Sequence, residues 1–379
     1  RAWKELFRVV LGIENFPPSE LDLLKWAGDA QRREQFKALE DVARNETLER
    51  LRDYLGPLVN FVFAAIDAGS ADDLIAIAML CELLEDKTVS SESNRAKVAA
   101  RLEVLFDGLT LSSDTTHRLA KAADEWFDRA GESSRQQQVA RYESLVTQVK
   151  AESLAVHARY GAAALREKTK AFAAALNAPN LQEAIARFGQ LRDHRGPVLS
   201  SQSELRCKMA LRLVSWLTQT TGSLPSALNV LAEQYRNEIA WVDWAQTVLL
   251  EGDDSAELAN AYGRLRENVF SRRDAFDRHF AEALANEKPN GTSLIPIEEA
   301  LDKCVAPIAV AGRTLLIIVD GMSIPVFLEL HHSLKDHGWV QFERGSGACS
   351  TLLAMLPSTT EASRTSLLCG TACTGSAST

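Results

Sequence analysis

Hydroxyl side chains and one arginine stand close together near the end of the sequence. The segment MLPSTTEASRTSLLCG, residues 355–370, places Ser358, Thr359 and Thr360 at the start of a helical pattern, with Arg364 one turn later. The first N–H groups of a helix have no partner within it, so this end binds anions such as phosphate. A threonine hydroxyl held there faces the phosphate, and a metal ion would favour its alkoxide form. The alternative is a plain helix cap, since serine and threonine are preferred at that position.

Asp320 is a second candidate, because it directly follows five apolar residues, 315–319, three of them β-branched. Such a run is typical of a strand that is covered on both faces in a parallel sheet. Ligands of open α/β sheets bind beyond the carboxyl ends of the strands, where a carboxylate can hold a divalent cation. Asp320 and Thr360 could therefore share one metal ion. The alternative is a structural turn, since Asp–Gly pairs turn well.

Spacing excludes several other chemistries. An integrin-type metal motif needs a serine two residues after the aspartate, but Ser323 lies three residues after Asp320. Met322 stands where a haloacid dehalogenase would carry its second aspartate. His332 and His337 are five residues apart rather than the four of a zincin pair.

The elements that must position these residues follow a long helical region. Helical periodicity runs through residues 1–285, and a break near 177–200 would divide it into two helical subdomains. Residues 286–296 contain proline, asparagine and glycine and are expected to form a linker. Residues 297–379 alternate helical and strand patterns, as the opening of an α/β domain does. Because the chain stops before such a domain can close, we expect it to be part of a longer protein.

Individual elements can also be predicted. Within the α/β part we expect strands over 315–319, 339–343 and 347–355, and helices over 324–338 and 360–370.

The helical region gives two sharper expectations. Ser70 and Asp73 have the spacing of a capping box, followed by a helix over 74–87 that is apolar nearly all round. Residues 139–180 are predicted as one long helix that is closed by Asn177, Pro179 and Asn180.

Composition limits the class of protein. Hydrophobic residues make up 46% of the chain and charged residues 25%, so it can bury a core. A net charge of −9 argues against general nucleic-acid binding, although a local basic face would still permit it. The six cysteines form no CxxC pair, which favours reduced thiols in a cytoplasmic protein. No apolar run reaches the roughly 18 residues of a membrane span, and we expect no membrane association.

The two candidate segments together are similar to a known family. LLIIVDGMS, residues 315–323, followed by LPSTTEASRTSLLCG, residues 356–370, resembles the PglZ family, a branch of the alkaline-phosphatase superfamily found in BREX phage-defence systems. SRTSLLCG, residues 363–370, is most similar to the PglZ proteins of the second BREX subtype. The resemblance implies a mainly α N-terminal region followed by the truncated start of an alkaline-phosphatase-like α/β domain.

The resemblance also implies roles for single residues. Asp320 would bind metal, and Thr360 would be the nucleophile and a ligand of the same ion. Related phosphodiesterases carry an asparagine at the position of Ser363, so Ser363 and Arg364 are candidate phosphate contacts here. The cofactor implied is a divalent metal, zinc by analogy, with two ions in the full-length protein. The remaining Asp and His ligands of the family lie further along the chain than residue 379.

Two functions follow from these expectations. The first is a metal-dependent phosphatase or phosphodiesterase-like component of a bacterial anti-phage (BREX) defence complex. The alternative is a helical scaffold that docks a partner, with a phosphatase-like domain that is secondary or inactive. Other BREX proteins are the implied partners, with nucleic acid reached through the complex. The substrate stays open among a nucleotide, a nucleic-acid end, a phosphoprotein and a second messenger.

Overall fold

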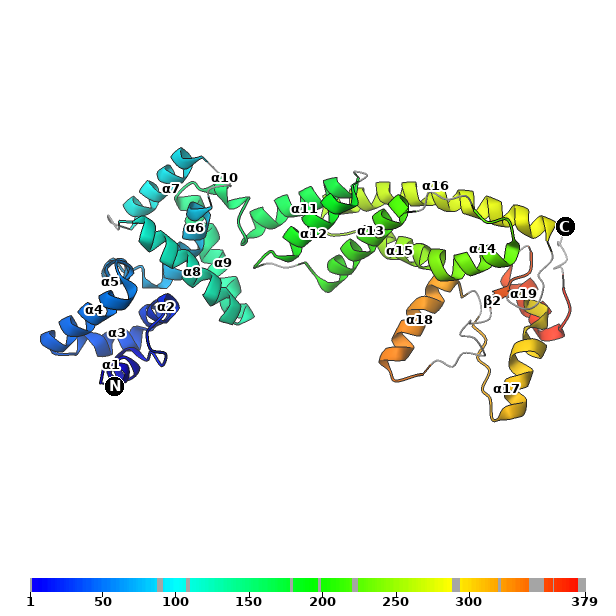
Figure 1. Ribbon diagram of the computed structural model, residues 1–379, viewed down its shortest axis with the longest axis horizontal. Helices are drawn as coiled ribbons and strands as arrows, with labels where there is room; N and C mark the ends of the chain where they lie inside the picture. Colours follow the sequence, from blue (N-terminus) through cyan, green and yellow to red (C-terminus); the bar gives the residue numbers. More distant parts are fainter. Residues whose placement is uncertain are drawn as a thin grey trace. The chain divides into compact units, whose positions relative to one another are not determined.

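The computed structural model describes residues 2–86, 91–106, 110–177, 180–196, 199–219, 224–287, 294–319, 322–340, 351–356 and 358–373. Its regular structure is almost entirely helical, which confirms the mainly α part of the predicted fold class. The chain divides into two compact units (Figure 1). Unit 1 comprises Arg1–Phe172 with Ala186–Ser200, and unit 2 comprises Ala173–Ile185 with Ser201–Thr379.

Unit 1 is built from short helices. They are α1 Ala2–Leu6, η1 Phe7–Leu11, α2 Glu20–Gly28, α3 Ala30–Lys37, α4 Asp41–Leu55, α5 Leu58–Asp67, η2 Ala71–Asp73, α6 Leu74–Glu85, α7 Glu92–Leu105, α8 Ser113–Arg129, α9 Glu132–Gln148 and α10 Glu152–Ala155. Helices α11 Ala162–Leu176 and α12 Leu181–Arg192 are each divided between the two units.

Helix α6 is the centre of unit 1. It packs against α8 and α9, and every side chain from Leu74 to Cys81 is buried. This burial confirms the helix predicted from an apolar pattern that runs nearly all round. Burial also raises the pKa of the Cys81 thiol, with a smaller contribution from Glu85, so this cysteine stays protonated and unreactive.

The capping box predicted at Ser70 is wrong. The Ser70 hydroxyl makes no cap hydrogen bond, and residues 71–73 form the short 3₁₀ turn η2 before α6 begins. The Asp73 carboxylate accepts a hydrogen bond from Arg141 Nη1 of α9 at 3.4 Å instead of capping the helix. A contact across the unit therefore replaces the local motif.

The long helix predicted over 139–180 is also wrong, because the chain breaks twice and forms α9, α10 and α11. Lys150 and Gly161 take positive φ angles of 52° and 84° at the breaks. Between them the Tyr160 hydroxyl donates to Glu82 Oε2 of α6 at 2.5 Å. Arg159 Nη1 also donates to Glu82 Oε1, at 3.1 Å. These polar contacts with the buried α6 favour the break over the continuous helix that local propensity alone would allow.

Unit 2 contains the remaining elements. They are α13 Ser201–Gln219, α14 Leu228–Gln234, η3 Tyr235–Ile239, α15 Ala240–Leu250, α16 Ala256–Asn286, β1 Leu294–Pro296, η4 Ile297–Glu299, η5 Leu301–Val305, α17 Ala306–Ala311, α18 Ile324–Asp336, β2 Thr351–Leu353 and α19 Thr360–Cys369.

Helices α13, α15 and α16 pack together in unit 2 (Figure 1). Asp243 of α15 accepts hydrogen bonds from the Tyr235 hydroxyl at 2.9 Å and from Arg273 Nε of α16 at 3.0 Å. Burial, and next the Asp243 carboxylate, raise the pKa of Tyr235 to about 12, so its hydroxyl stays protonated and donates. This Tyr235–Asp243–Arg273 network holds η3, α15 and α16 together around one half-buried carboxylate.

A two-stranded parallel sheet packs against α14 and α16. Leu294, Ile295 and Pro296 of β1 pair with Thr351, Leu352 and Leu353 of β2. Leu294 is buried in an apolar cluster with side chains of α14 and α16, such as Leu231 and Phe276. Helix α19 packs against η4, the turn that directly follows β1. Helix α19 is thereby connected to α14 and α16 through the turn η4 and the sheet.

The apolar run 315–319 does not form the predicted strand. These residues have no strand pairing with any other described residue, and their exposed fractions range from 43% for Ile318 to 83% for Leu315. A run that is apolar on both faces needs cover on both faces to be stable as a strand. The predicted start of an alkaline-phosphatase-like domain is thus not confirmed, since the described residues form only the two-stranded β1–β2 sheet beside their helices. The strand predicted over 339–343 lies mostly outside the described residues.

Replacing Asp243 by alanine should destabilise unit 2. The change leaves the largely buried Arg273 guanidinium and the Tyr235 hydroxyl without their shared acceptor, at a cost of about 2–4 kcal/mol in the free energy of unfolding. Urea unfolding followed by circular dichroism measures this cost. The control is Asp274→Ala, which removes an exposed bridge to Arg278 and should cost less than about 1 kcal/mol. Equal costs for the two variants would contradict a central role for Asp243.

Candidate site at the start of α19

The first turn of α19 is built by a helix cap. Thr359 has extended backbone angles, and its hydroxyl accepts a hydrogen bond from the Ala362 N–H at 3.3 Å. Helix α19 itself begins at Thr360 and ends at Gly370, whose φ of 66° is the left-handed conformation that glycine adopts readily. The helix predicted over 360–370 is confirmed, and Thr359 takes the capping role.

Helix geometry separates a buried face of α19 from a polar face. Ala362 and Ser366 are buried, and the Ser366 hydroxyl accepts a hydrogen bond from the Cys373 N–H at 2.9 Å. Thr360, Ser363 and Arg364 are three and four residues apart, so they share the opposite face. The three residues named from the sequence thus share one face of α19.

The three side chains are not equivalent. The Thr360 hydroxyl is exposed and makes no hydrogen bond within the described part of the chain. The half-buried Ser363 hydroxyl accepts from the Met355 N–H at 3.3 Å, which ties the segment after β2 to the helix. Arg364 is exposed on the same face as Thr360.

The sheet decides where this helix start lies. Strand β2 ends at Leu353, and the chain reaches Thr360 a few residues later. Because β1 and β2 are parallel, both strands have their carboxyl ends at the same edge of the sheet. The N-terminus of α19 therefore follows the carboxyl end of a parallel strand, the usual position of ligand sites in α/β folds.

The other predicted metal ligand, Asp320, lies outside the described residues. The helix that follows it, α18, begins at Ile324, has Pro325 in its first turn and packs against α15. Trp244 Nε1 of α15 donates to Glu329 Oε1 of α18 at 2.9 Å, which fixes this helix beside the helical bundle. In the described ranges no three His, Cys, Asp or Glu side chains are grouped so that they could hold a metal ion.

A small apolar pocket lies beside the sheet in unit 2. Its volume is about 210 Å³, and its walls include Tyr235, Phe276, Ile324, Leu352 and Leu353. Side chains of the helical bundle, of the first turn of α18 and of β2 thus converge on one cavity. Sequence reasoning missed this pocket because its walls come from segments that are far apart in the chain.

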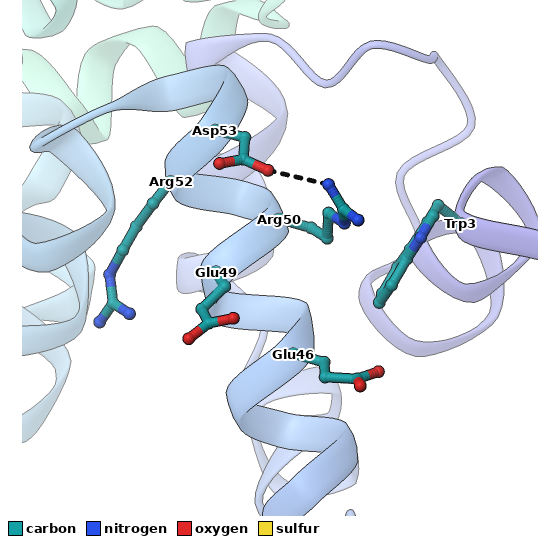
Figure 2. Close-up of a pocket in the computed structure, with 6 residues that line it drawn as sticks. All are labelled: Trp3, Glu46, Glu49, Arg50, Arg52 and Asp53. Atoms are coloured by element: carbon teal, nitrogen blue, oxygen red, sulfur yellow. Dashed lines mark hydrogen bonds and ion pairs between the residues drawn. The ribbon is translucent and has the colours of Figure 1, made fainter.

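Another cavity lies in unit 1. It has a volume of about 450 Å³ and is lined by Trp3, Glu46, Glu49, Arg50, Arg52 and Asp53. Figure 2 shows Arg50 between Asp53, its partner at 3.1 Å, and the Trp3 ring. The groove is polar and open and contains no nucleophile next to a base. We therefore assign it no catalytic role, despite its size.

A comparison with protein families finds a match for part of the chain. Residues 21–169 match the family described as the second domain of the BREX system PglZ protein. The match confirms the resemblance to the PglZ family that the sequence motifs indicate. The matched region runs from α2 into α11 and lies within unit 1, so it is separate from the segments whose motifs resemble PglZ in the sequence. No curated protein and no solved structure matches the chain.

Similarity to a domain of the BREX PglZ protein supports the assignment of the chain as a component of the BREX defence system, with other BREX proteins as the implied partners. The matched domain carries none of the candidate site residues, so the match does not test Asp320, Thr360, Ser363 or Arg364. No helix among the described residues is long and apolar enough to cross a membrane.

Substitution of the two neighbouring threonines should separate their structural roles. Thr359→Ala removes the cap of α19 and should cost about 1 kcal/mol in the free energy of unfolding. Thr360→Ala removes a hydroxyl that makes no described hydrogen bond and should leave stability within about 0.5 kcal/mol. Chemical denaturation of the two variants, side by side, measures the difference. A larger loss from Thr360→Ala would show that the cap is one residue further along.

Proposed function

We propose that this PglZ-like protein is a metal-dependent phosphoester hydrolase of the BREX system, and that Thr360 is its nucleophile. One observation supports the proposal most: Thr360 is the first residue of α19, exposed and outside the cap, after the carboxyl end of a parallel strand. At this position the unpaired N–H groups of the helix can hold phosphate oxygens while a hydroxyl stays available for attack.

The reaction divides among residues of this chain. The first N–H groups of α19 and the Arg364 guanidinium hold the phosphate oxygens and stabilise the charge that develops on them. The Thr360 oxygen forms a bond to phosphorus, loses its proton, and the bond from phosphorus to the leaving alcohol breaks. The leaving oxygen takes up a proton, and water then hydrolyses the phosphothreonine and regenerates the hydroxyl.

Asp320 and Thr360 are the residues of this chain that would hold a divalent ion, for which zinc is the proposed identity. An exposed hydroxyl and a carboxylate are suitable donors, but they are too few for a closed site, and no described cluster of ligands supplements them. When bound, the ion would lower the pKa of the attacking hydroxyl and neutralise charge on the phosphate. The full-length protein is proposed to supply further ligands and a second ion.

A second function, partner docking, is supported by a different observation. The family match falls on a helical region whose described residues contain no candidate metal cluster. Unit 1 has its own buried core around α6. We propose that this region is a docking module for another BREX protein, and that nucleic acid is reached through the assembled complex.

Turnover by Thr360 variants tests the hydrolase proposal. Thr360→Ala should lower the hydrolysis of an artificial phosphodiester or monoester by about a thousandfold or more, because the covalent route loses its nucleophile. Thr360→Ser should keep part of the activity, because the hydroxyl remains. The assay uses the metal-loaded full-length protein, with Thr359→Ala as the control that weakens the helix but keeps the nucleophile. Full activity of Thr360→Ala would exclude this mechanism.

Metal content tests the role of Asp320 separately. Asp320→Asn keeps the size and turn preference of the side chain but removes its charge, so the full-length protein should bind less metal and melt at nearly the same temperature. Elemental analysis after dialysis measures the stoichiometry, and the thermal midpoint controls for folding. Unchanged metal content and activity would show that Asp320 only forms a turn.

A further inference from the structure

Two arginine–tryptophan stacks lie on the helical surface of unit 2. The guanidinium carbon of Arg212, on α13, is 4.6 Å from the ring centroid of Trp241 on α15. The guanidinium carbon of Arg272, on α16, is 5.0 Å from the ring centroid of Trp216 on α13. Both distances lie well within the range of cation–π contacts.

The two stacks form one continuous feature. Arg212 and Trp216 are four residues apart on α13, so they lie on the same helix face with their Cβ atoms about 5–6 Å apart. Trp241, Arg212, Trp216 and Arg272 therefore follow one another across α15, α13 and α16. We call these four residues the Arg–Trp strip. Figure 1 shows the three helices running beside one another.

Charge distinguishes the strip from its surroundings. Arg278, further along α16, forms an ordinary ion pair with Asp274 at 2.7 Å. Arg212 and Arg272 have no carboxylate partner among the described residues, and Arg272 uses one donor on the Leu217 carbonyl at 2.8 Å. In a chain with a net charge of −9, these two unneutralised guanidinium groups form a local positive surface.

Other residues supply the buried apolar contacts between these helices. Leu213 and Val214 of α13, together with Val242 and Ala245 of α15, are buried and supply the apolar contact area of the bundle. Trp216 and Trp241, by contrast, are only half-buried, and Arg212 is exposed. The strip therefore presents flat cationic and aromatic groups to solvent.

We propose that the Arg–Trp strip binds single-stranded nucleic acid. The guanidinium N–H groups of Arg212 would contact backbone phosphates, and the planes of Arg212 and Trp216 would stack with exposed bases. A duplex keeps its bases stacked inside and cannot use these planes. The carboxylates of an acidic polypeptide could pair with the two arginines, but they have no flat ring to stack on the tryptophans. This inference does not rest on the chemistry proposed for Thr360.

The test measures binding of the 379-residue chain to a fluorescently labelled single-stranded oligonucleotide of mixed sequence at low salt, by polarisation. Arg212→Gln should weaken binding about tenfold, and Arg212→Lys should restore only part of it, because lysine keeps the charge but not the plane. The matched control is Arg278→Gln, which removes the same charge from a paired arginine and should change the affinity less than about twofold. Thermal melting of each variant confirms that it is folded.

Several outcomes would overturn the proposal. The first is no binding to the wild-type chain at protein concentrations of 100 µM, on the order of weak non-specific DNA affinities. The second is an equal loss for Arg212→Gln and Arg278→Gln, or full rescue by Arg212→Lys, because the effect would then be one of net charge alone. The third is tighter binding of duplex DNA or of an acidic polypeptide than of the single strand.

Discussion

The position of Thr360 depends on the parallel pairing of β1 with β2. The pairing of Leu294–Pro296 with Thr351–Leu353 brings together two segments that are far apart in the sequence. It sets the direction in which the chain leaves the sheet, and therefore the side on which α19 begins. A reversed strand would place Thr360 at the opposite edge, with its helix start away from any site shared by the strand ends.

This small sheet depends in turn on the helical bundle. A two-stranded sheet has little stability alone, so it needs a packed surface. Leu294 supplies this contact by joining the apolar cluster of α14 and α16. These two helices are also held together by Glu287, which accepts a hydrogen bond from the Leu228 N–H at 3.0 Å. The network around Asp243 links η3 and α15 to α16. The bundle is thus a structural platform for the segment that carries Thr360, as well as a surface in its own right.

Sequence patterns predicted those elements whose ends carry strong local signals. Pro325 and Gly338 bound α18, and Gly370 ends α19, so both helices were predictable from propensity alone. The apolar pattern of α6 likewise predicted its burial correctly. The residues that share one face of α19 follow from helix geometry once the helix start is known.

Long-range contacts decided the elements that were predicted wrongly. No local pattern indicates that Tyr160 and Arg159 bond to Glu82, so the breaks between α9 and α11 could not be foreseen. The run 315–319 has the composition of a buried strand, but composition cannot say whether the layers that would cover it are present. The Arg–Trp strip was hidden for the same reason, because its members come from three helices.

The central claim is that the Thr360 oxygen attacks phosphorus, and trapping the covalent intermediate tests it most directly. The full-length, metal-loaded protein would be mixed with a phosphoester, quenched in acid during turnover, digested and analysed by mass spectrometry. We expect a phosphorylated peptide from residues 345–364, with fragmentation placing the phosphoryl group on Thr360. A phosphoryl group on Thr359, or an unmodified peptide from an enzyme that is turning over substrate, would contradict it.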